Sequence, residues 1–390
     1  MRNIFIAIAL IIALSSCVKK QEQKGFDLKE FERGRILAKA DTLLNLKPIT
    51  VTTDTASRSA GGAHDFYSEG DYWWPDPVYP DGAYIRKDGL TNPDNFVAHR
   101  QAMVRFSQIA GALGSAYQIT GDIAFAKAIK PHLLAWFVNE ETRMNPSLNY
   151  AQAIKGKTEG RGIGIIDTVH LVEVALAVEQ LEKAGVFNPT DLAAIKLWFT
   201  EYMEWLTTTE FGLAEKNNGN NHSVTWALQV AAFARVSGDE EQVEEMRIFF
   251  KQTLLPQQMA ADGSFPEETK RTKPYGYSIF NLDAMTALAQ ILSTKEQDLF
   301  AYQTENALSL KNGMEFLYPY VKEKSKWPYE PDVMYWNDWP VAQPSLLFTG
   351  THYDQAKYID LWQTLDRNFN TTEVVRNMPV KHYTLWYSDL

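Results

Sequence analysis

The sequence contains a single cysteine, Cys17, among its 390 residues. One cysteine can form neither an intramolecular disulfide nor a cysteine-rich metal site, so both are excluded within this chain. Its 7 histidines show no spacing of the HxxxH type, which places two metal ligands on one helix face. We therefore predict no metal and no other cofactor, although ligands from distant loops would leave no local pattern.

The sequence also lacks an excess of positive charge, because 48 Asp and Glu outnumber 38 Lys and Arg and the formal net charge is −10 at pH 7. A nucleic-acid partner requires a basic surface, so the balance of charge argues against one. If the substrate is an anionic polymer, a local basic cleft must attract it rather than the field of the whole protein. Aromatic residues are plentiful, and they suit a large core and a sugar-stacking surface equally well.

The N-terminal segment has the pattern of a targeting signal. Arg2 precedes the apolar run Ile4–Leu14, which is too short to span a bilayer. The next residues, Leu-Ser-Ser-Cys, end at Cys17 and resemble a bacterial lipoprotein box. We predict a lipoprotein signal peptide over 1–17 and a polar tether over 18–25. The exported protein would then be held to the membrane only by lipid on Cys17, in the periplasm or at the cell surface.

Apolar residues recur at helical spacing along most of the chain, and strand-type alternation is scarce. Short breakers join consecutive helices, as in αα-hairpins. Several hairpins in series predict an all-α fold: an (α/α) toroid, or incomplete barrel, of about six to seven hairpins in a single domain over 26–390. The expected helices span 26–46, 100–118, 123–138, 165–185, 190–207, 222–237, 239–254, 279–293, 301–321 and 354–368.

The longer connections are expected to share one face of such a toroid, where loops on a rigid scaffold carry function. They are 47–98, 139–164, 208–221, 255–278 and 322–340.

A run rich in asparagine, residues 217–221, ends at His222, where a buried-helix pattern begins. Asparagine side chains accept the free N–H groups of a helix start, so we expect His222 in the first turn with Asn221 beside it. The alternative is a capped helix whose histidine simply packs.

A second cluster precedes the helix expected at 279 and contains Arg271, Lys273, Tyr275 and Tyr277. Basic side chains ahead of a helix N-terminus favour a carboxylate, because the helix start adds positive potential. The alternative is a solvated basic turn with packing tyrosines.

Together the two clusters suit β-elimination at a 4-linked uronic acid. Arg271 and Asn221 can donate hydrogen bonds to the substrate carboxylate and stabilise the enolate that develops. His222 and Tyr277 suit the two proton transfers, at C5 and at the departing O4. This set requires no metal.

Asn221-His222 at a helix start, followed by the 271–277 segment, looks like the alginate lyase superfamily of polysaccharide lyases. The resemblance implies an incomplete (α/α) toroid and metal-free elimination, with Tyr277 as acid and often base and His222 as base or orienter. It also implies carboxylate binding by Asn221 and Arg271. The spacing from arginine to tyrosine is one residue shorter here than in other members, so the alignment could instead place the catalytic tyrosine at Tyr275.

Further substrate contacts are predicted from aromatic and basic loop residues. Tyr72, Trp73 and Trp74 could stack on sugar rings, although core packing of a tryptophan is an equal alternative. Arg161 lies in a glycine-rich loop and could hold a neighbouring uronate, or form a structural ion pair. Lys273 and Tyr275 complete the predicted substrate-binding set, and a second aromatic loop, 326–339, is expected to line the cleft.

Three hypotheses follow. The first is a lyase acting on an anionic polysaccharide, most simply alginate, with glucuronan next. The second is a glycoside hydrolase on a similar toroid, which needs two paired carboxylates. The third is a non-catalytic glycan-binding lipoprotein. We expect a monomer, and the sequence does not distinguish mannuronate, guluronate and glucuronate. Candidate carboxylates for the hydrolase are Asp71, Asp76, Glu267 and Asp338.

Overall fold

The computed structural model describes residues 26–387 of the chain. The predicted signal peptide, the tether and Cys17 lie outside the described residues. Within the described range, none of the helices combines the length and apolar character needed to cross a bilayer.

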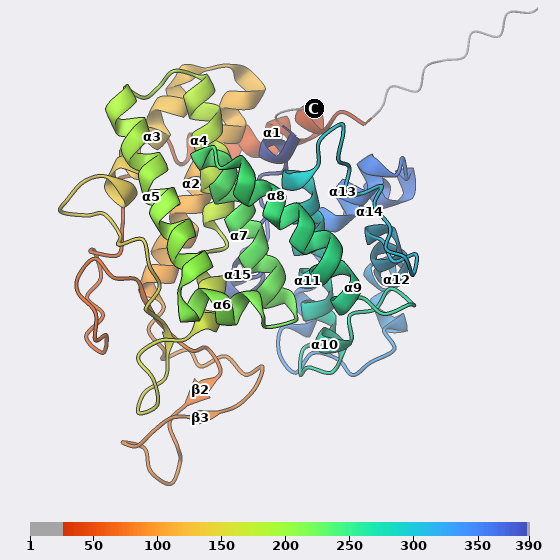
Figure 1. Cartoon of the computed structure of the whole chain (residues 1–390), viewed down its shortest axis with the longest axis horizontal. Coiled ribbons are helices and arrows are strands. Elements are labelled where there is room, and N and C mark those ends of the chain that lie inside the picture. The colour runs from red at the N-terminus through yellow and green to blue at the C-terminus, as the bar shows by residue number, and fades with distance from the viewer. Residues whose placement is uncertain (1–25, 388–390) are drawn as a thin grey trace, which may run out of the picture.

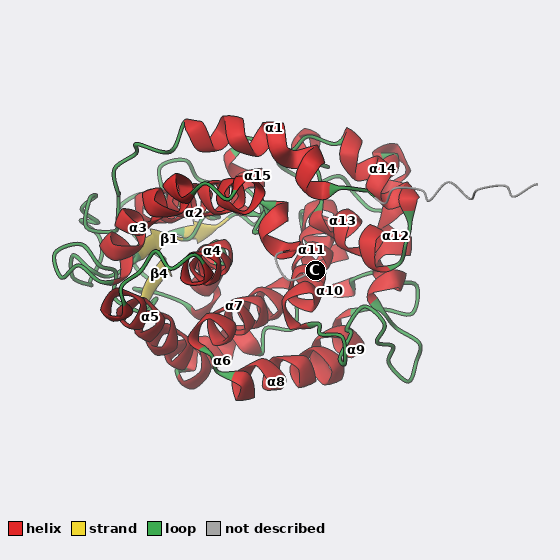
Figure 2. Ribbon diagram, turned by 90° about the horizontal axis from the view of Figure 1, so that it is seen from above, coloured by secondary structure: helices red, strands yellow, loops and turns green. Residues whose placement is uncertain are grey.

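Two layers of helices curve around a common interior (Figure 2). The inner helices pack in chain order, α2 against α4, α4 against α7, α7 against α11 and α11 against α13. They are α2 (Ala98–Thr120), α4 (Leu171–Lys183), α7 (Asn221–Ser237), α11 (Pro274–Leu292) and α13 (Pro344–His352). Nearly every residue of α7 and α11 is buried, because other helices enclose them on all sides.

The outer layer covers this inner arc. Its principal helices are α1 (Leu28–Asp41), α3 (Ile123–Phe137), α5 (Pro189–Thr208), α8 (Glu240–Phe249), α12 (Leu310–Lys322) and α14 (Ala356–Thr364). Helix α1 packs on α2, and its Phe31 meets Trp362 of α14 with ring centres 5.7 Å apart. Helix α1 therefore joins the two ends of the arc, and the all-α toroid predicted from the sequence is confirmed.

Short elements occupy the connections. The helices are α6 (Glu210–Lys216), α9 (Leu255–Gln258), α10 (Pro266–Thr269) and α15 (Thr372–Arg376). The strands form two small sheets: β1 (Tyr67–Glu69) runs parallel to β4 (Tyr150–Ala153), and β2 (Trp73–Trp74) pairs antiparallel with β3 (Ile85–Arg86). Figure 1 shows the β2–β3 hairpin at the same end of the molecule as α6 and α10.

Several expected boundaries were wrong. Helix α11 begins at Pro274 rather than at 279, since proline is favoured at the first helical position. Helix α12 begins at Leu310 rather than at 301. Helices α6 and α10 lie in segments expected to be loops, because helices of one or two turns show too little periodicity to be recognised. Helices α13 and α15 were not predicted.

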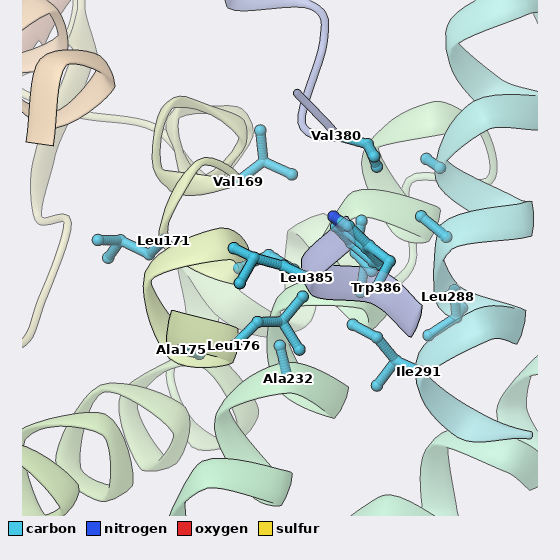
Figure 3. Close-up of a cluster of buried hydrophobic side chains, with 14 of the residues drawn as sticks. Val169, Leu171, Ala175, Leu176, Ala232, Leu288, Ile291, Val380, Leu385 and Trp386 are labelled. Atoms are coloured by element: carbon cyan, nitrogen blue, oxygen red, sulfur yellow. The ribbon is translucent and has the colours of Figure 1, made fainter. Parts of the chain in front are cut away.

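The C-terminal segment fills the interior of the ring at the end away from the β2–β3 hairpin. Leu385 and Trp386 lie among apolar side chains of α4, α7 and α11, including Leu176, Ala232 and Ile291 (Figure 3). These contacts lie near the C-terminal ends of α7 and α11, so the first turns of these helices lie at the opposite end.

Candidate active site

A pocket of about 300 Å³ opens at the end of the ring where α7 and α11 begin. The long 47–98 connection, strand β4, the segment before α4 and helix α15 also contribute to its wall. Its polar lining comprises Asp71, Tyr72, Trp73, Arg86, Gln152, Arg161, Asp167, Asn218, Asn220, Asn221, His222, Arg271, Tyr277, Arg376 and Asn377.

His222 lies in the first turn of α7 and is oriented by a buried glutamate. Asn220 caps the helix, its Oδ1 accepting from the His222 N–H at 3.0 Å. The His222 Nδ1 lies 2.6 Å from Oε1 of Glu215, a residue of α6 whose side chain is inaccessible to solvent. A carboxylate accepts only, so Nδ1 carries the proton and neutral His222 keeps the lone pair on Nε2. That nitrogen is suited to accept a proton.

Asn221 is held by a second buried glutamate, Glu268 of α10. The Asn221 Nδ2 donates to both carboxyl oxygens at 2.9 Å, and its backbone N–H donates to Oε1 at 2.7 Å. Burial raises the pKa of Glu268, although these donors and the nearby Arg271 oppose the rise. Glu268 thus fixes the Asn221 side chain at the pocket wall.

Tyr277 projects from the first turns of α11 into the pocket. Its hydroxyl is 2.7 Å from the hydroxyl of Tyr72, and the Arg271 guanidinium lies 4.7 Å from its ring centre. Burial raises the pKa of Tyr277 well above its usual range, and Tyr72 adds to the rise while Arg271 opposes it. Tyr277 is therefore protonated at neutral pH and can act as an acid.

Tyr275 lies only two residues earlier but faces another direction, as residues at this spacing do on a helix. Its side chain is fully buried, and its hydroxyl donates to the Tyr320 carbonyl at 3.1 Å. The start of α11 is capped from far along the chain, because Asp332 accepts from the backbone N–H groups of Tyr275 and Gly276 at 2.9 Å. This cap fixes the first turn of α11, from which Tyr275 and Tyr277 point in different directions.

Arg161 is a further cation in the pocket wall. Its Nε donates to the Gln152 carbonyl at 2.8 Å and its Nη2 to Gln152 Oε1 at 3.1 Å. It forms no ion pair with any carboxylate in the described part of the chain, and burial lowers its pKa to about 10. The guanidinium carbon lies 5.8 Å from the ring centre of Trp73. A cation and an aromatic ring thus face the same space.

The glycines around Arg161 permit a close backbone approach rather than binding a nucleotide. A Cβ on Gly160 would lie 2.0 Å from the Asn149 carbonyl oxygen, and one on Gly164 would lie 2.5 Å from the Ala151 side chain. Gln152 follows Ala151 in β4 and contacts Arg161. Its backbone φ is 49°, a region that non-glycine residues rarely adopt. The unusual backbone lets both Gln152 oxygens face Arg161.

Ion pairs form the rear wall of the pocket. Arg100 of α2 binds Asp71 at 2.6 Å and Asp167 at 3.2 Å, and Arg376 of α15 also binds Asp71. Burial disfavours a charged Asp71, but the two arginines outweigh it and hold the pKa of Asp71 well below its usual range. Asp71 is therefore ionised, and both Asp71 and Asp167 are already paired with Arg100.

The chain of ion pairs continues toward Tyr72. Arg376 Nη2 lies 2.8 Å from Glu373, and Lys273 Nζ lies 2.7 Å from the same carboxylate. Lys273 therefore faces the wall of charged groups behind the pocket.

Groups of His, Cys, Asp or Glu arranged to hold a metal ion do not occur among residues 26–387. The pocket instead combines the arginines Arg161 and Arg271 with the N-termini of α7 and α11, all of which favour an anion.

The comparisons with known proteins agree with this geometry. Residues 50–327 match the family model described as alginate lyase. The chain belongs to the alginate lyase family. An alginate lyase from Bacteroides ovatus is 31% identical with a TM-score of 0.79, and the match covers 93% of this chain and 96% of that one. No curated protein sequence matches significantly.

Two more distant structures share the fold of this family member. A variant of alginate lyase A1-III in complex with a tetrasaccharide is 16% identical with a TM-score of 0.57. The match covers 85% of this chain and 89% of that chain. Alginate lyase A1-III from Sphingomonas species A1 is 17% identical with a TM-score of 0.52. That match covers 85% of this chain and 90% of the other chain. The chain is a polysaccharide lyase with an (α/α) toroid fold.

In this lyase the four predicted catalytic residues, Asn221, His222, Arg271 and Tyr277, all line one pocket. Of the predicted substrate-binding residues, Tyr72, Trp73 and Arg161 line it as well.

Three residues predicted to bind substrate do not line this pocket. Tyr275 is enclosed by the 327–336 loop, with Trp327 and Trp336 ring centres 5.1 and 5.3 Å away. Trp74 donates from Nε1 to the Leu90 carbonyl at 2.9 Å, and Lys273 is paired with Glu373. The aromatic 326–339 loop therefore packs against Tyr275 instead of lining the pocket.

Sequence reasoning missed the groups that support the lyase's pocket. Glu215, Glu268 and Gln152 each orient a lining side chain, but only the seven-residue interval from Glu215 to His222 is local enough to leave a signal. That signal was hidden because α6 was expected to be a loop.

Proposed function

We propose that this lyase cleaves alginate by β-elimination, using its own side chains Asn221, His222, Arg271 and Tyr277. The observation that carries the proposal is the arrangement of all four around one pocket, although they come from two different helix starts. The 31% identical Bacteroides ovatus alginate lyase supports alginate as the polymer.

In this proposal the substrate carboxylate binds beside Arg271 and Asn221. Hydrogen bonds from these side chains neutralise its charge, which makes the C5 proton acidic and stabilises the enolate. Arg271 suits the task because its ion-pair partner within residues 26–387, Asp88, is 3.5 Å away, so the guanidinium is not tightly bound by that carboxylate.

Two proton transfers complete the reaction. The His222 Nε2 accepts the proton from C5, and the C5–H electron pair forms the C4–C5 double bond. The C4–O4 bond breaks and Tyr277 donates its proton to O4, which leaves with the preceding sugar. The roles follow from protonation, since the His222 Nδ1–H donates to Glu215 and leaves Nε2 to accept a proton, while Tyr277 holds its own.

A hydrolase is less well supported by the pocket. The two carboxylates that line it, Asp71 and Asp167, are both paired with Arg100. Neither is free to act as nucleophile or as a general acid, and the other candidates, Asp76, Glu267 and Asp338, do not line the pocket.

The test uses the matched tyrosines Tyr277 and Tyr275. Purified protein is incubated with polymannuronate, polyguluronate and glucuronan, and the ultraviolet absorbance of the new double bond is followed. We expect a rise on an alginate polymer and a loss of about 10²–10⁴-fold in Tyr277→Phe. Tyr275→Phe should retain turnover. No rise on either alginate polymer, or equal losses in the two variants, would contradict the proposal.

We also propose that the protein is exported and lipid-anchored through Cys17. The support is the apolar run and the Leu-Ser-Ser-Cys motif at residues 14–17. Labelling with a fatty-acid analogue should mark the wild type and fail in Cys17→Ser. A labelled Cys17→Ser protein would contradict the anchor.

A further inference from the structure

Lys273 is a buried cation close to Tyr277, the proposed acid. Unlike Tyr277, Lys273 does not line the pocket. Its side chain is 4% exposed and pairs with Glu373 at 2.7 Å. Its Nζ lies 3.5 Å from the Tyr72 hydroxyl and 5.0 Å from the Tyr72 ring centre. The ring of Tyr335, whose φ is 65°, also packs against it at 4.9 Å. The ammonium is thereby fixed against the phenol of Tyr72.

Tyr72 connects this ammonium to Tyr277. The two hydroxyls lie 2.7 Å apart, and either can donate. A phenol hydrogen bond strengthens when the accepting oxygen is charged, as the Tyr277 oxygen is once its proton has left. Tyr72 must then be the donor, because tyrosinate only accepts. A cation next to the Tyr72 oxygen favours this direction, since it repels the phenol proton toward Tyr277.

We propose that Lys273 is a positioning residue for Tyr277 and acts through Tyr72. Its ammonium orients the Tyr72 hydroxyl as a donor and stabilises the negative charge that Tyr277 acquires when it protonates O4. The inference rests on the proposed function, in which Tyr277 exchanges a proton with the substrate.

The other charges around the two phenols do not replace this cation. Arg271 lies over the ring of Tyr277, but its guanidinium is expected to bind the substrate carboxylate. Glu373 lies between Lys273 and Arg376, and Arg376 is itself bound to Asp71. Lys273, in contrast, contacts the Tyr72 hydroxyl itself.

The first experiment compares kcat and KM for Lys273→Met and Lys273→Arg on the polymer that the wild type cleaves. We expect Lys273→Met to lower kcat about tenfold or more, which corresponds to one pKa unit of lost stabilisation, with little change in KM. Lys273→Arg should retain most of kcat, because the charge remains. Lys311→Met, at an exposed lysine of α12, serves as the matched control.

The second experiment separates an electrostatic role from a structural one. In a Tyr72→Phe background, Lys273→Met should add less than about a twofold loss, because the connecting hydroxyl is gone. Difluorotyrosine at position 277 has a more acidic phenol, so it should restore most of the kcat lost in Lys273→Met. If Lys273→Met does not fold, the double variant with Glu373→Gln removes both buried charges and takes its place.

Three results would overturn the inference. They are a rise in KM at unchanged kcat, an equal loss in Lys273→Arg, and an absence of rescue by difluorotyrosine. A wild-type protein that forms no unsaturated product on any polyuronate contradicts the proposed function instead, so the two failures are distinguishable.

Discussion

The two ends of the toroid are built on the same inner helices, yet the charged side chains at each end are paired differently. At the far end, a cavity of about 540 Å³ is lined by Arg247 and other polar groups, and Arg247 pairs with Glu244 at 2.8 Å. At the pocket end, Arg161 has no carboxylate partner among the described residues. Paired charge stabilises a fold, whereas cations left without an anion are ready to bind one.

Two buried glutamates also differ, one that binds the C-terminal segment and one beside the pocket. Glu173, in the first turn of α4, accepts from the backbone N–H groups of Lys381 and His382 at 2.8 Å, and from His382 Nδ1 at 2.7 Å. Burial alone would raise the pKa of Glu173, but His382 and these donors lower it to about 2. Glu268 at the pocket has a raised pKa instead. One carboxylate anchors the C-terminal segment, and the other, beside a site for anions, ionises less readily than an exposed glutamate.

The largest effect is expected from Glu173→Ala. Removing this carboxylate leaves His382 and two backbone N–H groups buried without an acceptor, which should cost about 3–5 kcal/mol of unfolding free energy. Chemical unfolding measures the loss, and kcat of the folded fraction should remain near that of the wild type. A matching loss of kcat would show that the Glu173 cluster and the pocket are not independent.

The same residue predicts the direction of acid unfolding. Its folded pKa is depressed, so its contribution is complete above the unfolded value of about 4.3 and is lost as the pH falls toward about 2. The difference in unfolding free energy between Glu173→Ala and the wild type should therefore disappear as the pH falls across that interval. A difference that persists at the acid end would contradict the assignment.

Arg271→Ala tests the pocket end. We expect kcat/KM to fall about 10²–10³-fold, the usual consequence of removing one donor to a developing oxyanion, with little change in melting temperature. Arg247→Ala places the same substitution at the far end and should leave kcat/KM near the wild-type value. If Arg247→Ala proves equally damaging to turnover, the functional contrast between the ends is wrong.

Glu215→Gln should have a smaller effect on turnover. Glutamine can either accept from or donate to Nδ1, so His222 no longer keeps a free Nε2 in one tautomer, and kcat should fall about 10²-fold. The measurement is steady-state elimination kinetics, with Glu244→Gln at the far end as the control. Unchanged kcat would remove His222 from the proton transfer.

The smallest effect concerns Glu268. As the pH rises through its raised pKa, Glu268 ionises and repels the substrate carboxylate, so KM should increase by less than about tenfold. Glu268→Gln keeps an acceptor for Asn221 but cannot ionise, and its KM should not show that increase. The same increase in the variant would assign the pH dependence to another group.

Much of the ring and part of the pocket could be predicted from local spacing. Apolar periodicity identified the long helices, since one face of each must be buried whatever its neighbours are. The capped start at Asn220 placed Asn221 and His222 in the first turn of α7, because capping depends only on adjacent residues. Arg271 and Tyr277 were recognised by their chemistry and by a family resemblance.

The sequence by itself determined that a helical ring forms and that a polar site lies at the starts of its inner helices, because both depend on contacts within one or two turns. Only the tertiary structure decided which tyrosine enters the pocket, since Asp332 caps α11 from another part of the chain. It likewise decided that Glu268 holds Asn221 and that Lys273 faces Tyr72. Such contacts join distant segments, and packing of the whole ring brings them together.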